Sequence, residues 1–153
     1  AIENNKYAMG TAVERSASEP LFYRRGESFR IPGIQVDGMD VLAVRGAPEE
    51  AMAWTQAGKG PIILELLTYR YRGHSMSDPA KYRTKEEVQD YREHRDPIDH
   101  AAAELAKLGI KEDELKAIDK EIKDIVVEAA KFAEDAPEPD PAELYTDVLV
   151  ESY

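Results

Sequence analysis

The chain has 153 residues, of which 42% are apolar and 33% are charged, and it carries no cysteine and a formal net charge of −11. This length is sufficient for one domain with a hydrophobic core, and no apolar run approaches the roughly 18–20 residues that span a membrane. The acidic balance argues against nucleic acid as a partner, because Lys and Arg carry most of the affinity for a phosphate backbone, and the lack of cysteine excludes disulfides and thiolate metal sites.

The N-terminal part of the chain predicts loops and one short strand. Residues 1–5 read as the end of a strand, and residues 5–11 as the loop that follows it. Because a domain rarely begins at such a point, we expect the chain to be a piece of a longer protein. Residues 16–33 contain two prolines and two glycines and predict irregular structure. Residues 34–36 alternate in polarity and stop at the turn signal Asp37-Gly38, which predicts a short strand.

Helical signals follow this strand. Asp40 is a suitable cap for a helix over the residues after it. Pro48 then suits the first turn of a helix that runs to about Gln56. The glycines of Gly58-Lys59-Gly60 end it.

Residues 61–68 form the clearest strand. Their apolar run is nearly continuous, which is typical of a strand buried on both faces of a parallel sheet. Glu65 interrupts the run and needs a partner, because a buried carboxylate is costly without hydrogen bonds. The order of helix, buried strand and polar loop is one α/β unit. Since ligands in such folds bind beyond the carboxyl ends of the strands, the loop at 69–83 is the expected place for a site.

The C-terminal part of the chain predicts helices. Thr84 and Glu87 have the spacing of a capping box, and Asp96-Pro97 begins a further helix that Gly109 closes. A last amphipathic helix, which we interpret as a packing helix, is predicted by apolar residues spaced three and four apart: Leu115, Ile118, Ile122, Ile125, Ala129 and Phe132.

The loop at 69–83 concentrates groups that can bind an anion. Arginine forks and a histidine bind phosphate oxygens by charge-assisted hydrogen bonds, and Gly73 allows a close backbone approach or a sharp bend. A solvated basic surface loop with internal Arg–Asp pairs explains the same composition equally well. The polar residues of the loop are Arg70, Arg72, His74, Ser75, Ser77, Asp78, Lys81, Tyr82 and Arg83.

Two other kinds of site are disfavoured. A hydrolase triad of His74, Ser75 and Asp78 is improbable, because near neighbours in a loop rarely place nucleophile and base within reach and no Gly-x-Ser-x-Gly elbow is present. His94 and His100 lie on predicted helices, where we expect exposed polar side chains, and no His/Asp/Glu set has zinc spacing.

The residues Asn4-Asn5-Lys6-Tyr7 follow the first strand end. An Asn side-chain oxygen and a backbone carbonyl are hard ligands that suit Mg²⁺ when a carboxylate and substrate phosphates complete the site. An ordinary turn is the alternative interpretation of this segment.

Several segments together resemble the alpha subunits of thiamine-diphosphate-dependent 2-oxo-acid dehydrogenases, and the pyruvate dehydrogenase group most closely. The phosphorylation-loop signature of that family is similar to Arg72-Gly73-His74-Ser75-Met76-Ser77-Asp78-Pro79 with Tyr82-Arg83-Thr84. The closing half of its thiamine-diphosphate motif is similar to Glu3-Asn4-Asn5-Lys6-Tyr7-Ala8-Met9-Gly10-Thr11. Further matches, in order, are Ile31-Pro32-Gly33, Val36-Asp37-Gly38-Met39-Asp40 and Gly58-Lys59-Gly60-Pro61.

The resemblance implies an α/β fold. Residues 1–83 would form the C-terminal half of a thiamine-diphosphate-binding module, with a parallel sheet flanked by helices and the active-site loop at 69–83. Residues 84–153 would form a helical C-terminal region.

The resemblance also implies roles for single residues. Asn5 would bind Mg²⁺ through its side chain and Tyr7 through its backbone carbonyl. His74 would contact the diphosphate of thiamine diphosphate and help the acyl group to pass to the lipoyl arm, with Arg70 and Gly73 beside it. Ser75 matches the main regulatory phosphorylation site of animal enzymes, where a phosphate would add roughly −1.5 to −2 charge beside the diphosphate.

The sequence departs from the family pattern at identifiable positions. The Gly-Asp-Gly half of the cofactor motif is missing, and with it the Asp that completes the Mg²⁺ site. The other two serines phosphorylated in animal enzymes correspond to Ala12 and Lys81, which favours a bacterial protein. The Glu that activates the cofactor lies on the beta subunit in this family.

The implied function is oxidative decarboxylation of pyruvate with transfer of the acetyl group to lipoamide. The implied partners are a beta subunit in an α2β2 heterotetramer and the lipoyl domain of the acyltransferase core. A branched-chain 2-oxo-acid or acetoin dehydrogenase is the alternative enzyme, and a fragment that is inactive alone and serves only in assembly is the alternative outside catalysis. We expect the cytoplasm of a bacterium, or the mitochondrial matrix if the protein is eukaryotic, and neither a nucleic acid nor a membrane as partner.

Overall fold

The structure is a computed structural model that describes residues 1–146, in two units. The first unit is Ala1–Leu108, and the second begins at Gly109. The predicted domain boundary after residue 83 stays a prediction, and the end of the predicted helical region, residues 147–153, lies outside the described residues.

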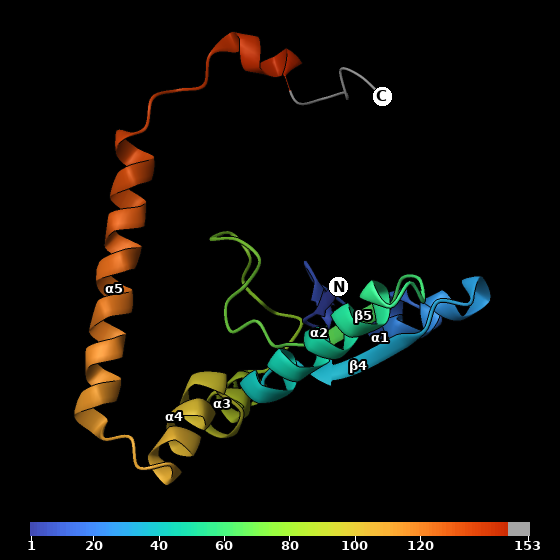
Figure 1. The fold of residues 1–153 in the computed structure, drawn as a ribbon, viewed down its shortest axis with the longest axis horizontal. Coiled ribbons are helices and arrows are strands. Elements are labelled where there is room, and N and C mark those ends of the chain that lie inside the picture. The colour runs from blue at the N-terminus through green and yellow to red at the C-terminus, as the bar shows by residue number, and fades with distance from the viewer. Residues whose placement is uncertain (147–153) are drawn as a thin grey trace. The chain divides into compact units, whose positions relative to one another are not determined.

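A three-stranded parallel sheet organises the first unit (Figure 1). Its strands are β1 (Ile2–Asn4), β4 (Gly33–Asp37) and β5 (Ile63–Leu67), and β5 lies between the other two. The strands predicted at the N-terminus, at 34–36 and at 61–68 are therefore confirmed. Since all three strands run parallel, the turn after β1 and the loop after β5 begin at the same edge of the sheet.

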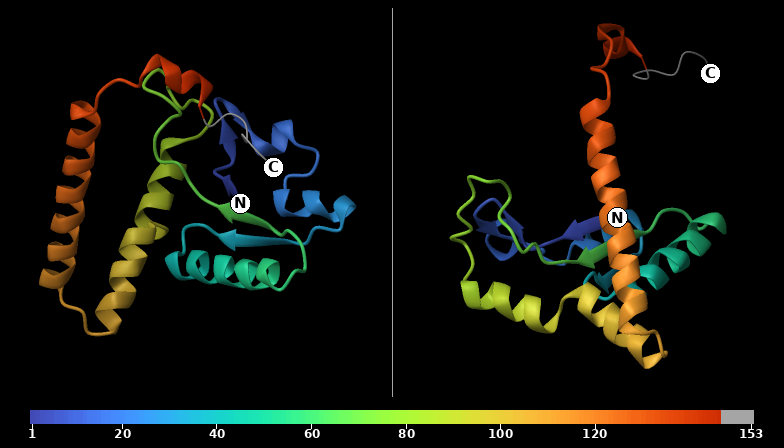
Figure 2. Two further views of the ribbon diagram at one scale, coloured as in Figure 1. Left: turned by 45° about the horizontal axis from the view of Figure 1, so that its top comes forward. Right: turned by 90° about the vertical axis from the view of Figure 1, so that its left-hand side faces the viewer.

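Helix α2 (Val41–Gln56) packs on β4 and β5, as both views of Figure 2 show. The Asp40 side chain caps it by accepting hydrogen bonds from the backbone N–H groups of Leu42 and Ala43. The prediction that a separate helix starts at Pro48 is wrong, because one continuous helix includes this proline. A proline in a helix removes one hydrogen bond, and the cap and the packing on two strands keep the remaining turns together.

Two N-terminal segments are more regular than the sequence suggests. The predicted loop at 5–11 is mostly a small hairpin of β2 (Tyr7–Ala8) and β3 (Thr11–Ala12), whose turn has positive φ at both Met9 (45°) and Gly10 (107°). This is the turn that tight hairpins favour, but it lacks the usual Asn-Gly signal. The predicted irregular stretch at 16–33 contains the 3₁₀ helix η1 (Phe22–Phe29). The short helix α1 (Val13–Ser16) ends at the first residue of this stretch.

Two helices follow the loop in the first unit. Helix α3 (Lys85–His94) has Thr84 as its cap, and the Thr84 hydroxyl accepts a hydrogen bond from the Glu87 N–H at 3.1 Å. Helix α4 (Pro97–Lys107) begins after Asp96, whose carboxylate accepts hydrogen bonds from Ile98 and Asp99. Both predicted helix starts are confirmed.

The second unit contains helix α5 (Glu112–Asp135) and a short 3₁₀ helix η2 (Pro141–Tyr145). The predicted amphipathic helix is confirmed, and its apolar residues Ile118, Ile122, Ile125 and Phe132 are exposed within the chain. Among the described residues, no helix combines the length and the apolar character that crossing a bilayer requires.

The core of the first unit is small and lies on the sheet. Its buried apolar side chains are Val36, Met39, Ala51, Leu64 and Tyr69. The largest fully buried side chain is that of Glu65, in the middle of the central strand. The fold is thus an α/β arrangement whose central strand carries a charged group.

Candidate functional site

The Glu65 carboxylate has the partners that the sequence required. It accepts hydrogen bonds from Asn4 Nδ2 at 2.7 Å, from the Tyr23 backbone N–H at 3.1 Å and from Gln35 Nε2 at 3.3 Å. Burial alone would raise the pKa of Glu65, but these three donors outweigh it and lower that pKa below its ordinary value. The carboxylate therefore stays charged and joins all three strands to η1.

The two asparagines after β1 have different roles. Asn4 is buried, with its amide donating to Glu65 and its Oδ1 accepting from the Lys6 N–H at 3.0 Å. The Asn5 side chain makes no hydrogen bond to any of residues 1–146 and lines two neighbouring hollows. Asn5 is therefore the residue of the pair with an oxygen available to a ligand.

A small cavity lies between the turn after β1 and the loop after β5. We call it the Asn5 cavity; it has a volume of about 20 Å³, room for about one water molecule. Its lining includes the predicted site residues Asn5, Tyr7, Arg70 and His74, and the rest is Met9, Tyr82 and Arg83. A larger hollow of about 570 Å³ shares Asn5 and Arg70 with it and extends along residues 68–71 to Glu3.

Arg70 and His74 form a pair at this cavity. Arg70 Nη1 lies 3.2 Å from His74 Nδ1, and Nη2 donates to the His74 carbonyl at 3.3 Å. Because a guanidinium only donates, Nδ1 must accept, and the neutral ring then carries its proton on Nε2. The pair offers a fixed positive charge and an imidazole N–H, which together suit an anionic oxygen.

The Asp78 side chain organises the loop around His74. It accepts hydrogen bonds from the backbone N–H of His74 at 2.7 Å, from that of Ala80 at 2.8 Å and from the Tyr82 hydroxyl at 2.9 Å. These bonds, led by the one from His74, lower the pKa of Asp78 below its ordinary value. Asp78 contacts the His74 backbone rather than the ring, which is not the geometry of a hydrolase triad.

The remaining predicted site residues lie in the loop outside the Asn5 cavity. A Cβ on Gly73 would lie 2.7 Å from the Asp78 carbonyl oxygen, so the tight loop requires glycine there. Ser75 is exposed, and its hydroxyl lies 3.0 Å from that of Ser77. His94 and His100 are exposed on α3 and α4, as predicted.

A cluster of tyrosines around Glu87 holds the turn and the loop together, and sequence reasoning missed it. The Glu87 carboxylate accepts hydrogen bonds from the hydroxyls of Tyr7 and Tyr69, each at 3.1 Å. Tyr69 stacks on Tyr91 at 3.9 Å between ring centroids, and burial, reinforced by Glu87, raises the pKa of Tyr69 to about 12. The capping-box prediction is therefore half right, since the Glu87 side chain reaches these tyrosines rather than the start of its own helix.

Arg83 completes this cluster. Its guanidinium donates to the carbonyls of Arg70 and Tyr71 and lies over the rings of Tyr69 and Tyr82. The loop is thus fixed at its base by Arg83 and inside by Asp78. The sign of this cluster in the sequence is the recurrence of tyrosine at positions 69, 71, 82 and 91. Composition alone does not show that these side chains lie close together.

Comparison with known proteins gives a family match. The sequence model of the family described as dehydrogenase E1 component matches residues 1–142. The pyruvate dehydrogenase E1 component subunit alpha of Rhizobium meliloti (strain 1021) is 61% identical over 150 residues, which are 97% of this chain and 43% of that protein.

Two further relatives show the range of the similarity. The subunit of the same name in Zymomonas mobilis is 56% identical over 152 residues, 99% of this chain and 43% of that protein. The somatic, mitochondrial form of Bos taurus is 49% identical over 144 residues, 93% of this chain and 36% of that protein. The chain therefore spans less than half of the length of these relatives.

Proposed function

The chain belongs to the dehydrogenase E1 component family, and from that premise we propose that it forms part of the alpha subunit of a pyruvate dehydrogenase. In this proposal it contributes the C-terminal half of a thiamine-diphosphate site to an enzyme that decarboxylates pyruvate oxidatively and passes the acetyl group to lipoamide. The observation that carries the proposal is the Asn5 cavity, because it brings Asn5, Tyr7, Arg70 and His74 together from two separate segments.

The residues of the Asn5 cavity fit a metal-bound diphosphate in part. Asn5 would supply a side-chain oxygen and Tyr7 a backbone carbonyl to Mg²⁺, both of the hard type that this ion prefers. Arg70 and His74 would donate to diphosphate oxygens. Among residues 1–146 no group of three or more acidic, His or Cys side chains is placed to hold a metal alone, so the remaining ligands would come from the diphosphate and from residues outside this chain.

The residues of the chain bind and orient in this mechanism. Thiamine diphosphate, when bound, supplies the nucleophilic carbon and the electron sink for decarboxylation. His74 would donate from Nε2–H to a diphosphate oxygen, and its imidazole could hold or release a proton during acyl transfer. Arg70 holds the imidazole from the Nδ1 side, and Gly73 and Ser75 form the backbone on either side of His74, with Asp78 keeping the loop in place.

The partners of the chain are part of the same proposal. We propose a beta subunit in an α2β2 heterotetramer, the lipoyl domain of the acyltransferase core, and pyruvate as substrate. The exposed apolar residues of α5 are consistent with a chain that packs against others. The bacterial relatives support the cytoplasm of a bacterium as its location, and the mitochondrial relative supports the matrix if the protein is eukaryotic.

The test is an assay of the assembled enzyme on pyruvate, on a branched-chain 2-oxo acid and on acetoin. We expect a preference for pyruvate, and His74→Gln should lower the rate by about a hundredfold because general acid–base residues contribute on that scale. His100→Gln, which changes an exposed histidine of α4, is the matched control and should leave the rate unchanged. Preference for another substrate, or equal effects of the two variants, would overturn the proposal.

A second candidate is that the chain alone serves only in assembly. It is favoured by the lack of an acidic metal ligand in the Asn5 cavity. Calorimetry of the 153-residue chain with thiamine diphosphate and Mg²⁺ separates the two ideas. We expect no measurable binding to the isolated chain and restored binding in the assembled enzyme, whereas loss of binding in both would leave assembly as the function.

A further inference from the structure

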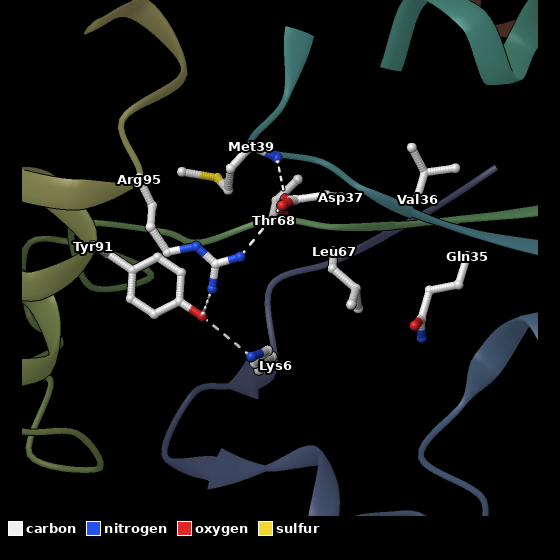
Figure 3. A pocket seen from close by; sticks show the side chains of 9 residues that line it. All are labelled: Lys6, Gln35, Val36, Asp37, Met39, Leu67, Thr68, Tyr91 and Arg95. Atoms are coloured by element: carbon white, nitrogen blue, oxygen red, sulfur yellow. Dashed lines mark hydrogen bonds and ion pairs between the residues drawn. The ribbon is translucent and has the colours of Figure 1, made fainter. Parts of the chain in front are cut away.

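A second cavity lies beyond the carboxyl ends of β4 and β5, against helix α3. We call it the Lys6 cavity; it has a volume of about 230 Å³ and shares no lining residue with the Asn5 cavity. Figure 3 shows the side chains of Lys6, Tyr91 and Arg95 meeting there. Its lining residues are Lys6, Gln35, Val36, Asp37, Met39, Leu67, Thr68, Tyr91 and Arg95.

The Lys6 cavity holds more positive charge than negative. Lys6 takes part in no ion pair among residues 1–146, and its Nζ donates to the Tyr91 hydroxyl at 3.3 Å. Arg95 Nη2 lies 3.3 Å from Asp37, the one carboxylate in the lining, and both side chains are about half exposed. Solvent screens such a pair, so it holds Arg95 only weakly.

Hydrogen-bond donors in the Lys6 cavity outnumber the acceptors. The Tyr91 oxygen already accepts from Lys6 at 3.3 Å and from Arg95 Nη1 at 3.5 Å, and its own proton has no acceptor among the described residues. An acceptor bound in the Lys6 cavity would satisfy this hydroxyl.

The backbone directs Lys6 to this cavity at an energetic cost. Its φ of 69° lies in the left-handed region, which a residue with a side chain rarely adopts. The conformation is held by the Lys6 N–H, which donates to Asn4 Oδ1, and by the Lys6 carbonyl, which accepts from Val13 at 2.9 Å. As a result Lys6 lines one cavity while its neighbours Asn5 and Tyr7 line the other.

We propose that the Lys6 cavity binds a phosphate group, either as free phosphate or as the end of a small phosphorylated compound. The Lys6 ammonium, the Arg95 guanidinium and the Tyr91 hydroxyl suit a tetrahedral oxyanion, and Lys is a common phosphate ligand. The volume of the Lys6 cavity is about 230 Å³, more than ten times that of the Asn5 cavity, which has room for about one water molecule. The Lys6 cavity shares no lining residue with the Asn5 cavity, and the proposal for it does not rest on the proposed function.

The test is calorimetric titration of the assembled protein, saturated with thiamine diphosphate, at constant ionic strength. Inorganic phosphate, glycerol phosphate and acetate are the three probes. We expect saturable binding of at least one phosphate probe and about tenfold weaker binding in Arg95→Gln, because a charge-assisted hydrogen bond contributes on that scale. Tyr91→Phe removes only the hydroxyl and should weaken binding several-fold, and Arg92→Gln, the same change of charge on α3 outside the cavity, should not weaken it.

Each result decides the matter. Binding of free phosphate identifies the ion as a ligand, and binding of glycerol phosphate alone identifies a phosphorylated compound. Acetate binding as tightly as phosphate, no saturation above a chloride control, or equal affinity in Arg95→Gln and Arg92→Gln would overturn the proposal. The same titrations without thiamine diphosphate distinguish a failure of the proposed function from a failure of the phosphate site. A protein that does not bind thiamine diphosphate would give the same phosphate isotherm with and without this cofactor.

Discussion

Two carboxylates, Glu65 and Asp78, perform the same task in different surroundings. Each accepts three hydrogen bonds and has a lowered pKa. Glu65 is fully buried in the central strand, whereas Asp78 lies in a loop near the surface. The comparison teaches that one chemical device can hold a fold or shape a functional loop, and that burial decides which of the two it does.

The largest effect is expected at Glu65. Glu65→Ala leaves the donors of Asn4, Tyr23 and Gln35 without an acceptor inside the protein and should reduce the free energy of unfolding by about 3 kcal/mol or more. Glu49→Ala, on the exposed face of α2, is the control and should change it by less than ~0.5 kcal/mol. Denaturant unfolding measures both, and equal effects would show that the buried network contributes little.

A smaller effect is expected at Glu87, which like Asp78 is only partly buried. Glu87→Gln keeps the shape but weakens the bonds from Tyr7 and Tyr69, which should cost about 1 kcal/mol in the free energy of unfolding. Its exposed neighbour Glu86, changed to Gln, is the matched control. The tyrosine hydroxyls give a second readout, because the raised pKa of Tyr69 should fall in Glu87→Gln, and an unchanged titration of Tyr69 would contradict the described contact.

The Asp78 substitution should act on the loop alone. Asp78→Asn weakens the acceptor for the N–H groups of His74 and Ala80, so amide hydrogen exchange at these positions should become faster while the midpoint of global unfolding stays unchanged. Asp90→Asn, on the exposed side of α3, should alter neither. A large fall in the unfolding midpoint of Asp78→Asn would mean that the loop belongs to the core.

The smallest effect is a pH dependence of the loop. Because the pKa of Asp78 is lower in the folded state, its contribution is present above the unfolded value, about 3.9, and is lost as the pH falls through the folded pKa. Exchange of the His74 amide, corrected for its intrinsic rate, should therefore speed up only in acid. In Asp78→Asn this acid-dependent step should be absent, and its persistence would assign it to another group.

The sequence predicted the elements that have strong local signals. The buried strand at 63–67, the caps at Asp40, Thr84 and Asp96, and the amphipathic α5 follow from residue pattern alone. The hairpin at 7–12 was missed because Met9 occupies a positive-φ position that sequence rules reserve for Gly or Asn.

The candidate site, too, could be predicted from the sequence only in part. The separate tasks of Asn4 and Asn5 depend on the parallel pairing of β1 with β5, which brings Asn4 to Glu65. The pairing of Arg70 with His74 depends on the fold of the loop that contains both. The need for partners at Glu65 was evident from its place in an apolar run, but their identity was not, since Tyr23 and Gln35 come from segments far along the chain. Glu87 was taken for a capping residue because its spacing from Thr84 was the only local signal.

The central claim is that the turn after β1 and the loop after β5 face one metal-bound diphosphate. Titration of thiamine diphosphate with Mg²⁺ into the assembled enzyme tests it most directly, with Asn5→Ala, His74→Gln and His100→Gln compared. We expect Asn5→Ala to weaken the apparent affinity for Mg²⁺, and His74→Gln that for the cofactor, each by about tenfold, as the loss of a charge-assisted contact implies. His100→Gln should match the unchanged enzyme, and affinities equal in all three variants would contradict the claim.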